Sequence, residues 1–217
     1  MDLLKEVVLT AEEIYYIGKK INGRFLDYDY IASMADFGRI RNMKMEEIVD
    51  SLVRKRYAEE DLFGNVDIDP QVLDFIYPVY NSIFESELSV IEGAEPKIRY
   101  KFHIMDDQSV AVCGTGHEYR ICRSDSRSRL ELLRALTGIQ QDAGEAPSEI
   151  TMDQAENILI TKGMWIGTEA AVYLYGIANE AFYAPDKVQT DENNTVRMHR
   201  ISGNVFEKQV MQVLNGG

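Results

Sequence analysis

Three runs of alternating apolar and polar residues in the middle of the chain restrict its fold most strongly. They are KIRYKFHI (97–104), SVAVCGT (109–115) and EYRICRS (118–124), and each has the period of two that is typical of a half-buried β-strand. Tight turns at 106–107 and 114–116 separate them. The pattern predicts a three-stranded antiparallel meander, and a helical segment, RSRLELLRALTG, follows it.

The first 90 residues have a helical period instead. A capping signal, Thr10 followed by Glu13, opens a helix that continues to about Gly23. The segment 42–56 has an apolar stripe at helical spacing, and 69–88 begins with an N-cap followed by proline at the first helical position. We expect helices in these three segments, a shorter helix in DYDYIASMADFG, and a kink or break at the internal proline of 69–88.

The segment YAEEDLFGNVDI (57–68) predicts a two-stranded ribbon that turns at Gly64-Asn65. A helix with three cations at its end, followed by such a ribbon, is typical of a winged helix. Residues 1–90 nevertheless contain 18 Asp and Glu against 10 Lys and Arg. The candidate recognition helix also carries Glu46, Glu47 and Asp50 in its first half, where base contacts would be made. Repulsion from a polyanion therefore disfavours DNA binding.

The C-terminal part repeats the order of helix, meander and helix. We expect a helix at 151–163 with Thr151 as its cap, strands at 170–178, 181–185 and 195–201, and a last helix at 204–214. The fold class predicted is α+β: winged-helix-like N-terminal helices, then two pseudo-repeated antiparallel units of a three-stranded meander plus helix, which can join into one continuous sheet.

The expected organisation places all portions in one compact domain. A helical winged-helix-like portion spans 1–94, a first meander-plus-helix unit spans 95–138, and a second helix-meander-helix unit spans 150–217. The segment 139–149, IQQDAGEAPSE, is the most linker-like part of the chain and separates the two units.

The composition narrows the classes of function. A net charge of −13 disfavours binding to phosphates and to anionic membranes. The cysteines, Cys113 and Cys122, provide no disulfide framework and fit a reducing compartment. The charged N-terminus does not fit a signal peptide, and no apolar run approaches the length that spans a bilayer. These features predict a soluble, acidic, cytoplasmic protein.

Catalytic and metal-binding patterns are weak. The sequence has neither a G-x-x-x-x-G-K-[ST] loop nor a G-x-G-x-x-G segment after a strand. Cys113 and His117 are the nearest approach to a nucleophile and base, but they lie across a turn with no orienting acid. The three histidines, His103, His117 and His199, are scattered rather than clustered as metal ligands would be. We therefore expect a protein that is not an enzyme, with no cofactor and no metal.

The order of these segments resembles the ESX secretion-associated chaperone family of type VII secretion systems. The similarity rests on LVRKRYAEEDLFGNVDIDPQVLDF and on the meander KIRYKFHIMDDQSVAVCGTGHEYRICRS with its following helix. The positions that match are Leu52, Tyr57, Gly64, Val66, Asp67 and Pro70 in the first pattern, and Ile98, Tyr100, Val110, Val112, Tyr119 and Ile121 in the second. Arg56 stands where the family prefers glycine.

The resemblance implies a non-enzymatic chaperone or adaptor that holds a helical-hairpin secretion substrate in the cytosol. The composition differs from that of high-GC actinobacterial members and favours a Firmicutes-type relative. The expected partner is then a helical hairpin of the Trp-Xaa-Gly type or the helical leader of a toxin, with no nucleic acid and no membrane insertion. A homodimer is compatible with this role.

Large apolar or amphipathic residues beside the polar loop 186–194 form the predicted partner-binding surface. They are Trp165, Tyr173, Tyr175, Phe182, Tyr183 and Val188. Such residues on alternating strand positions are also typical of a core, so burial is the competing interpretation. At the level of the whole chain, the alternative functions are an acidic winged-helix-containing regulatory or interaction protein and, with less support, a DNA-binding transcription factor.

Overall fold

The structure is a computed structural model, and it describes residues 4–23, 44–93, 95–115, 118–138, 146–185 and 196–217. The chain forms two units. The N-terminal unit comprises residues 1–83 and 103–123, and the C-terminal unit comprises 84–102 and 124–217. The chain therefore passes from one unit to the other three times. The portions expected from the sequence stay predictions.

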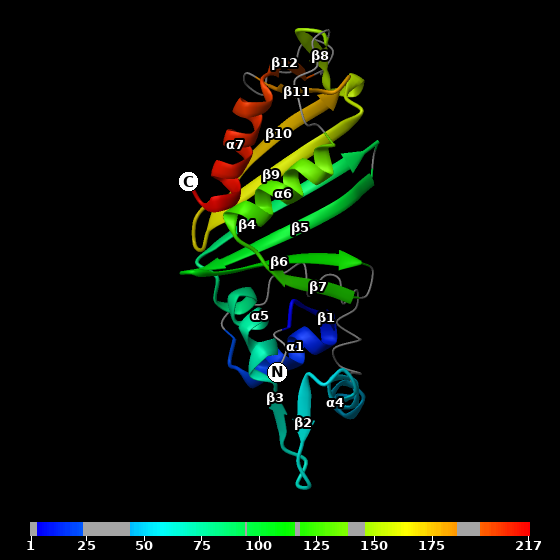
Figure 1. Ribbon diagram of the computed structural model, residues 1–217, viewed down its shortest axis with the longest axis vertical. Helices are drawn as coiled ribbons and strands as arrows, with labels where there is room; N and C mark the ends of the chain where they lie inside the picture. Colours follow the sequence, from blue (N-terminus) through cyan, green and yellow to red (C-terminus); the bar gives the residue numbers. More distant parts are fainter. Residues whose placement is uncertain (1–3, 24–43, 94, 116–117, 139–145, 186–195) are drawn as a thin grey trace. The chain divides into compact units, whose positions relative to one another are not determined.

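The N-terminal unit packs helices on a small antiparallel sheet with strand order β1-β7-β6 (Figure 1). Its elements are β1 (Glu6–Thr10), α1 (Ala11–Lys20), α4 (Met45–Arg54), β2 (Ala58–Glu60), β3 (Val66–Ile68), α5 (Pro70–Asn81), β6 (Gln108–Thr115) and β7 (Glu118–Arg123). Helices α1 and α5 pack against each other, and α5 packs on all three strands. Strands β2 and β3 form a separate two-stranded ribbon.

Local sequence signals explain where these helices begin. At α1, Thr10 Oγ1 accepts a hydrogen bond from the Glu13 backbone N–H at 3.2 Å, and Glu13 Oε2 accepts one from the Thr10 N–H at 2.7 Å. This is the predicted capping box, which satisfies two backbone donors that would otherwise lack partners. At α5, the Asp69 carboxylate accepts from the Gln71 N–H at 2.7 Å. Both predicted helix starts are confirmed.

Helix α4 ends in a Schellman motif. The Arg56 N–H donates to the Val53 carbonyl and the Tyr57 N–H donates to the Leu52 carbonyl, both at 2.9 Å. Arg56 closes this motif with φ of +59°, a left-handed conformation that glycine adopts at lower cost. Arg56 therefore holds this position at a conformational cost that glycine would not have.

In the N-terminal unit, a buried carboxylate pairs with a partly buried lysine. Glu13 is 1% exposed, and Lys55 Nζ donates to its Oε2 at 2.7 Å and to the Val8 carbonyl at 3.1 Å. One of the three cations at the end of the candidate recognition helix is therefore committed to the interior of the unit.

The C-terminal unit is a larger antiparallel sheet with strand order β5-β4-β9-β10-β11-β12-β8. Its elements are β4 (Phe84–Glu92), β5 (Glu95–Met105, which belongs to this unit as far as Phe102), α6 (Ser126–Thr137), β8 (Glu149–Thr151), a 3-10 turn (Met152–Gln154), β9 (Asn157–Trp165), β10 (Ala171–Ala178), β11 (Ala181–Ala184), β12 (Arg197–Ile201) and α7 (Gly203–Asn215).

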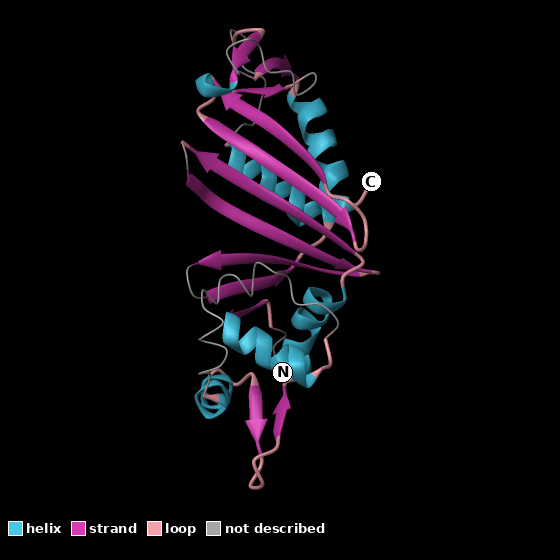
Figure 2. Cartoon of the chain, turned by 180° about the vertical axis from the view of Figure 1, so that it is seen from behind, coloured by secondary structure: helices cyan, strands magenta, loops and turns pink. Residues whose placement is uncertain are grey.

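Helices α6 and α7 lie on one face of this sheet, and no described helix covers its other face (Figures 1 and 2). The two helices are tied together by the Arg134 guanidinium, which donates to both carboxylate oxygens of Glu207 at 2.7 and 2.8 Å. Arg129 Nε also donates to Asn215 Oδ1 at 2.9 Å. Helix α7 packs on β4, β9 and β11, and it therefore limits the part of this sheet face that solvent can reach.

Two predicted helices need correction. The segment 151–163 is a single 3-10 turn followed by β9, because β-branched residues such as Ile158 and Ile160 favour a strand that pairs with β4 and β10. The helix predicted for 69–88 ends at Asn81, and Phe84–Glu92 is strand β4. The short helix predicted in 27–38 lies outside the described residues.

The central meander, the ribbon and the helices at 126–137 and 203–215 are confirmed. The α+β class with a large antiparallel sheet is confirmed as well. The strands at the start of the chain and at 84–92 were not anticipated, and the winged-helix-like and pseudo-repeat descriptions stay predictions.

Candidate functional site: an apolar groove beside α7

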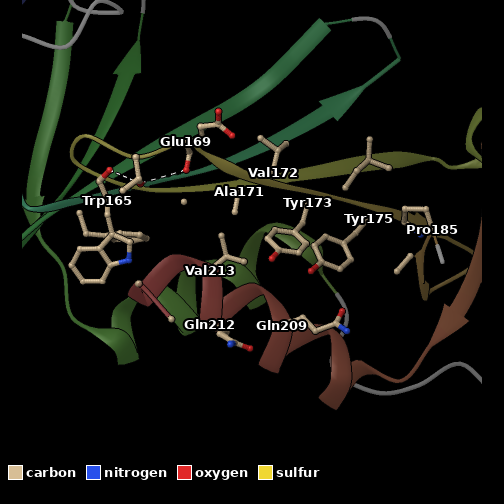
Figure 3. Close-up of a pocket in the computed structure, with 17 residues that line it drawn as sticks. Trp165, Glu169, Ala171, Val172, Tyr173, Tyr175, Pro185, Gln209, Gln212 and Val213 are labelled. Atoms are coloured by element: carbon tan, nitrogen blue, oxygen red, sulfur yellow. Dashed lines mark hydrogen bonds between the residues drawn. The ribbon is translucent and has the colours of Figure 1, made fainter. Parts of the chain in front are cut away.

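An apolar groove of about 840 Å³ lies between strands β9 to β11 and helix α7 in the C-terminal unit (Figure 3). Strand β10 supplies Ala171 to Tyr175, and α7 with the residues after it supplies Gln209, Gln212, Val213, Gly216 and Gly217. The remaining lining residues are Phe84, Gly163, Trp165, Thr168, Glu169, Ala184 and Pro185. Glu169 is the one described lining residue with a carboxylate or basic side chain.

The alternation of β10 places its tyrosines in the groove. Ala171, Tyr173 and Tyr175 are two residues apart, so they share one face of the strand. Figure 3 shows the rings of Tyr173 and Tyr175 side by side, projecting from β10 toward α7. Tyr173 is 48% exposed, whereas Tyr175 is 2% exposed. Tyr173 thus offers contact surface, and Tyr175 forms the floor.

Trp165 forms the end of the groove near the close of β9. It pairs with Phe84 of β4, and the two rings lie 5.1 Å apart at an interplanar angle of 58°. The indole nevertheless remains 49% exposed. A large aromatic side chain fixed by a neighbouring ring and open to solvent is typical of a contact residue in a protein interface.

Small residues keep the groove open and set the distance to α7. At Gly163 of β9, a Cβ atom would lie 3.0 Å from the Phe84 ring and 3.1 Å from the Val213 carbonyl oxygen, so a larger residue would force Phe84 or α7 to move by a few tenths of an ångström. Ala171 faces Gly163 across the β9–β10 pair. The methyl group of Ala171 leaves unfilled the volume that a larger side chain would occupy.

Helix α7 is anchored through Phe206, which is fully buried. Its ring stacks on Phe182 at 3.9 Å and meets Tyr175 edge-on at 5.2 Å. Burial, with a smaller contribution from Tyr173, raises the pKa of Tyr175 to about 12, so this phenol stays neutral at ordinary pH. The aromatic cluster holds the helix in place and leaves the neighbouring groove open.

The turn between β9 and β10 gives the groove a defined rim. Thr168 donates to the Trp165 carbonyl twice, through its backbone N–H at 2.9 Å and its hydroxyl at 2.8 Å (Figure 3). These bonds close the turn that carries the exposed side chain of Glu169.

The structure brings three of the six predicted partner-binding residues together in the groove: Trp165, Tyr173 and Tyr175. Phe182 and Tyr183 belong instead to the interior, at 4% and 0% exposed, so they offer a partner no surface. Phe182 anchors α7, and the Tyr183 hydroxyl donates to the Pro147 carbonyl at 3.1 Å. Val188 lies outside the described residues.

Sequence reasoning missed the helical wall of the groove. Gln209, Gln212 and Val213 recur at helical spacing in α7, next to the buried stripe of Phe206 and Val210. That spacing was visible in the sequence, because the two glutamines flank an apolar stripe. The sequence did not show that this flank faces β10.

The groove is lined mainly by apolar and aromatic side chains, which suit contact with apolar surface. In the described part of the chain, no three His, Cys, Asp or Glu residues are grouped so that they could hold a metal ion. No disulfide joins Cys113 and Cys122, and burial raises the pKa of the Cys122 thiol. Among the described helices, none is long and apolar enough to span a membrane.

The comparison with solved structures identifies a similar fold. The chain matches the Mycobacterium tuberculosis type VII secretion system chaperone EspG5, solved in complex with a PE25-PPE41 dimer, with a TM-score of 0.61. The alignment covers 98% of each chain at 8% sequence identity. No protein-family model and no curated protein matches the sequence. The chain therefore has a fold similar to that of EspG5, which agrees with the fold that the sequence resemblance implied.

Proposed function

We propose that the protein is a type VII secretion-associated chaperone or adaptor that acts by holding a client, without catalysis. The observation that carries this proposal is the apolar groove, with Trp165 and Tyr173 about half exposed, in a chain with the fold of EspG5. An exposed apolar site of this size favours association with apolar surface on another molecule.

The proposed client is a helical hairpin of the Trp-Xaa-Gly type or the helical leader of a toxin, from a Firmicutes-type system. EspG5 was solved with a PE25-PPE41 dimer, which supports a protein client of the secretion system. The apolar tip of a helical hairpin would otherwise aggregate in water, and the groove offers aromatic surface to cover it. The acidic character of the chain keeps the loaded complex soluble in the cytosol.

The test is co-expression with a small helical-hairpin protein encoded beside the chain, followed by measurement of its soluble fraction and of the dissociation constant. The double variant Trp165→Ser/Tyr173→Ser should weaken binding at least about tenfold, because exposed aromatic anchors supply much of the binding energy in such interfaces. Its unfolding midpoint should change little, since both side chains are about half exposed.

Val205→Ser is the matched control. Val205 is 44% exposed on α7 but does not line the groove, so its loss should leave client binding unchanged. Equal binding by the groove variant and the wild type would refute the proposed site. Absence of any helical-hairpin client in the native host would refute the chaperone function.

A further inference from the structure

The ribbon of β2 and β3 presents two large apolar side chains directly to solvent. We call residues 58–68 the finger. Leu62 and Phe63 occupy its turn and are 101% and 91% exposed, the highest values among the exposed large hydrophobic residues of the described chain. Two adjacent apolar side chains without any packing partner mark a contact site rather than a structural element.

The finger is rigid at both ends. At its base, Ala58 is buried in the core of the N-terminal unit, and the Asp69 N–H donates to the Tyr57 carbonyl at 2.9 Å. Val66, which pairs with Glu60 next to the turn, is buried in the same core. At its tip, Asp61 Oδ1 accepts from the backbone N–H groups of Phe63 and Asn65 at 2.8 and 2.9 Å.

A third hydrogen bond stabilises the tip: Asp61 Oδ2 accepts from the Asn65 side-chain amide at 2.7 Å. Gly64 turns the chain with φ of +80°. These hydrogen bonds, that of the Asn65 side chain above all, lower the pKa of the Asp61 carboxyl. The backbone that carries the apolar pair is therefore held in one conformation before any partner arrives, which reduces the entropic cost of binding.

The charges around the tip have one sign. Glu59, Glu60, Asp61 and Asp67 are exposed on the finger. No Lys or Arg occurs between Arg56 and Lys97 in the sequence. Carboxylates that surround an apolar anchor are complementary to basic side chains that surround an apolar pocket.

We propose that the finger is a second docking surface, which inserts Leu62 and Phe63 into an apolar pocket rimmed by Lys and Arg side chains on a different protein. An anionic membrane is disfavoured because it repels four carboxylates at the tip. A second copy of this chain is disfavoured because it brings a net charge of −13, and the described lining of its own groove contains no Lys or Arg. This proposal does not depend on the client groove.

The test places the photo-crosslinking residue p-benzoylphenylalanine at position 63 of the full chain, expressed in its native host. The same residue at Tyr77, which is 39% exposed on α5, is the positional control. Irradiation should give a position-63 adduct with one protein, and its crosslinked peptide should contain apolar residues close to Lys or Arg. The added Leu62→Ser substitution should reduce adduct yield about tenfold or more.

A charge test separates this docking from non-specific apolar contact. Glu59→Lys/Glu60→Lys should reduce the yield about tenfold, and the wild-type yield should fall as salt is raised. Glu46→Lys/Asp50→Lys changes the net charge equally on exposed positions of α4 and should have little effect. Circular dichroism melting checks that each variant folds.

Three results would overturn the proposal. The first is a crosslinking yield at position 63 that is no higher than at position 77. The second is crosslinking mainly to lipid or to another copy of this chain. The third is an equal loss of the adduct in both charge variants. Because Trp165→Ser/Tyr173→Ser should leave the position-63 adduct intact, failure of the finger and failure of the client groove are distinguishable.

Discussion

In each unit, a helix packs across antiparallel strands. Only in the N-terminal unit do side chains fill the space between helix and strands completely. In the N-terminal unit, Phe75, Ile76 and Val79 of α5 are at most 2% exposed. In the C-terminal unit, α7 buries Phe206, Val210 and Leu214, yet its flank at Gln209 to Val213 borders an open groove.

The position of small residues explains the difference. Gly18 of α1 makes room for Tyr80 of α5, whose ring fills the space and whose hydroxyl donates to the Ile14 carbonyl at 2.8 Å. In the C-terminal unit, Phe84 and Val213 pack closely on Gly163. Ala171, which faces Gly163 on the neighbouring strand, instead borders the open groove. Small residues therefore accompany a closed core in one unit and an open groove in the other.

Phe206→Ala should have the largest effect, because it removes the ring that anchors α7. We expect a loss of about 3–5 kcal/mol in the free energy of unfolding, measured by urea denaturation. Client binding should fall with it, since α7 forms one wall of the groove. A loss below about 1 kcal/mol would show that α7 does not depend on its aromatic anchor.

Gly18→Ala tests how tightly the N-terminal unit is closed. The added methyl group would collide with the Tyr80 ring, and we expect a net cost of about 1–3 kcal/mol. In a Tyr80→Ala background the same substitution should instead stabilise the protein by up to about 1 kcal/mol, because alanine is the better helix former. The four unfolding free energies form a double-mutant cycle, and additivity would contradict the proposed contact.

Arg56→Gly should stabilise the N-terminal unit slightly. Glycine relieves the left-handed strain at the end of α4 but gains conformational freedom in the unfolded chain. The free energy of unfolding should therefore increase by about 0.5–1 kcal/mol. Arg56→Ala, which keeps the strain, is the matched control and should not stabilise. The measurement is again the urea midpoint.

Ala171→Trp should have the smallest effect on stability. Ala171 is exposed in the groove, so added bulk has space, and we expect a change within about 0.5 kcal/mol. The indole would nevertheless fill part of the groove and compete with the client for it. If Ala171→Trp destabilised the protein as strongly as Gly18→Ala does, the contrast between a closed and an open contact would be lost.

The sequence predicted elements whose signals are local. The capping box at Thr10, the N-cap at Asp69 and the strict alternation of 97–124 each specify a structure within a few residues. Strand β9 was missed because Ile158, Leu159 and Ile160 form a short apolar run rather than an alternation, and such a run does not distinguish a strand from a helix. The helix cap predicted at Thr151 then suggested a helix, where the structure has one 3-10 turn.

The site was predictable to a similar degree. Aromatic content and strand alternation pointed to Trp165, Tyr173 and Tyr175, but not to which of them stay exposed. That distinction depends on Phe206, some thirty residues beyond Tyr175, and no local pattern in the sequence encodes this contact. Phe206 also stacks on Phe182 and so covers that side chain.

The division of the chain between its two units has a consequence for synthesis on the ribosome. The N-terminal unit needs residues 103–123, which supply β6 and β7, before the apolar face of α5 is covered. Helix α5 is complete at Asn81, so roughly forty residues must still be translated, which takes roughly 2–8 s at ordinary elongation rates. During that interval the nascent chain exposes the face that becomes the best-sealed part of the finished protein.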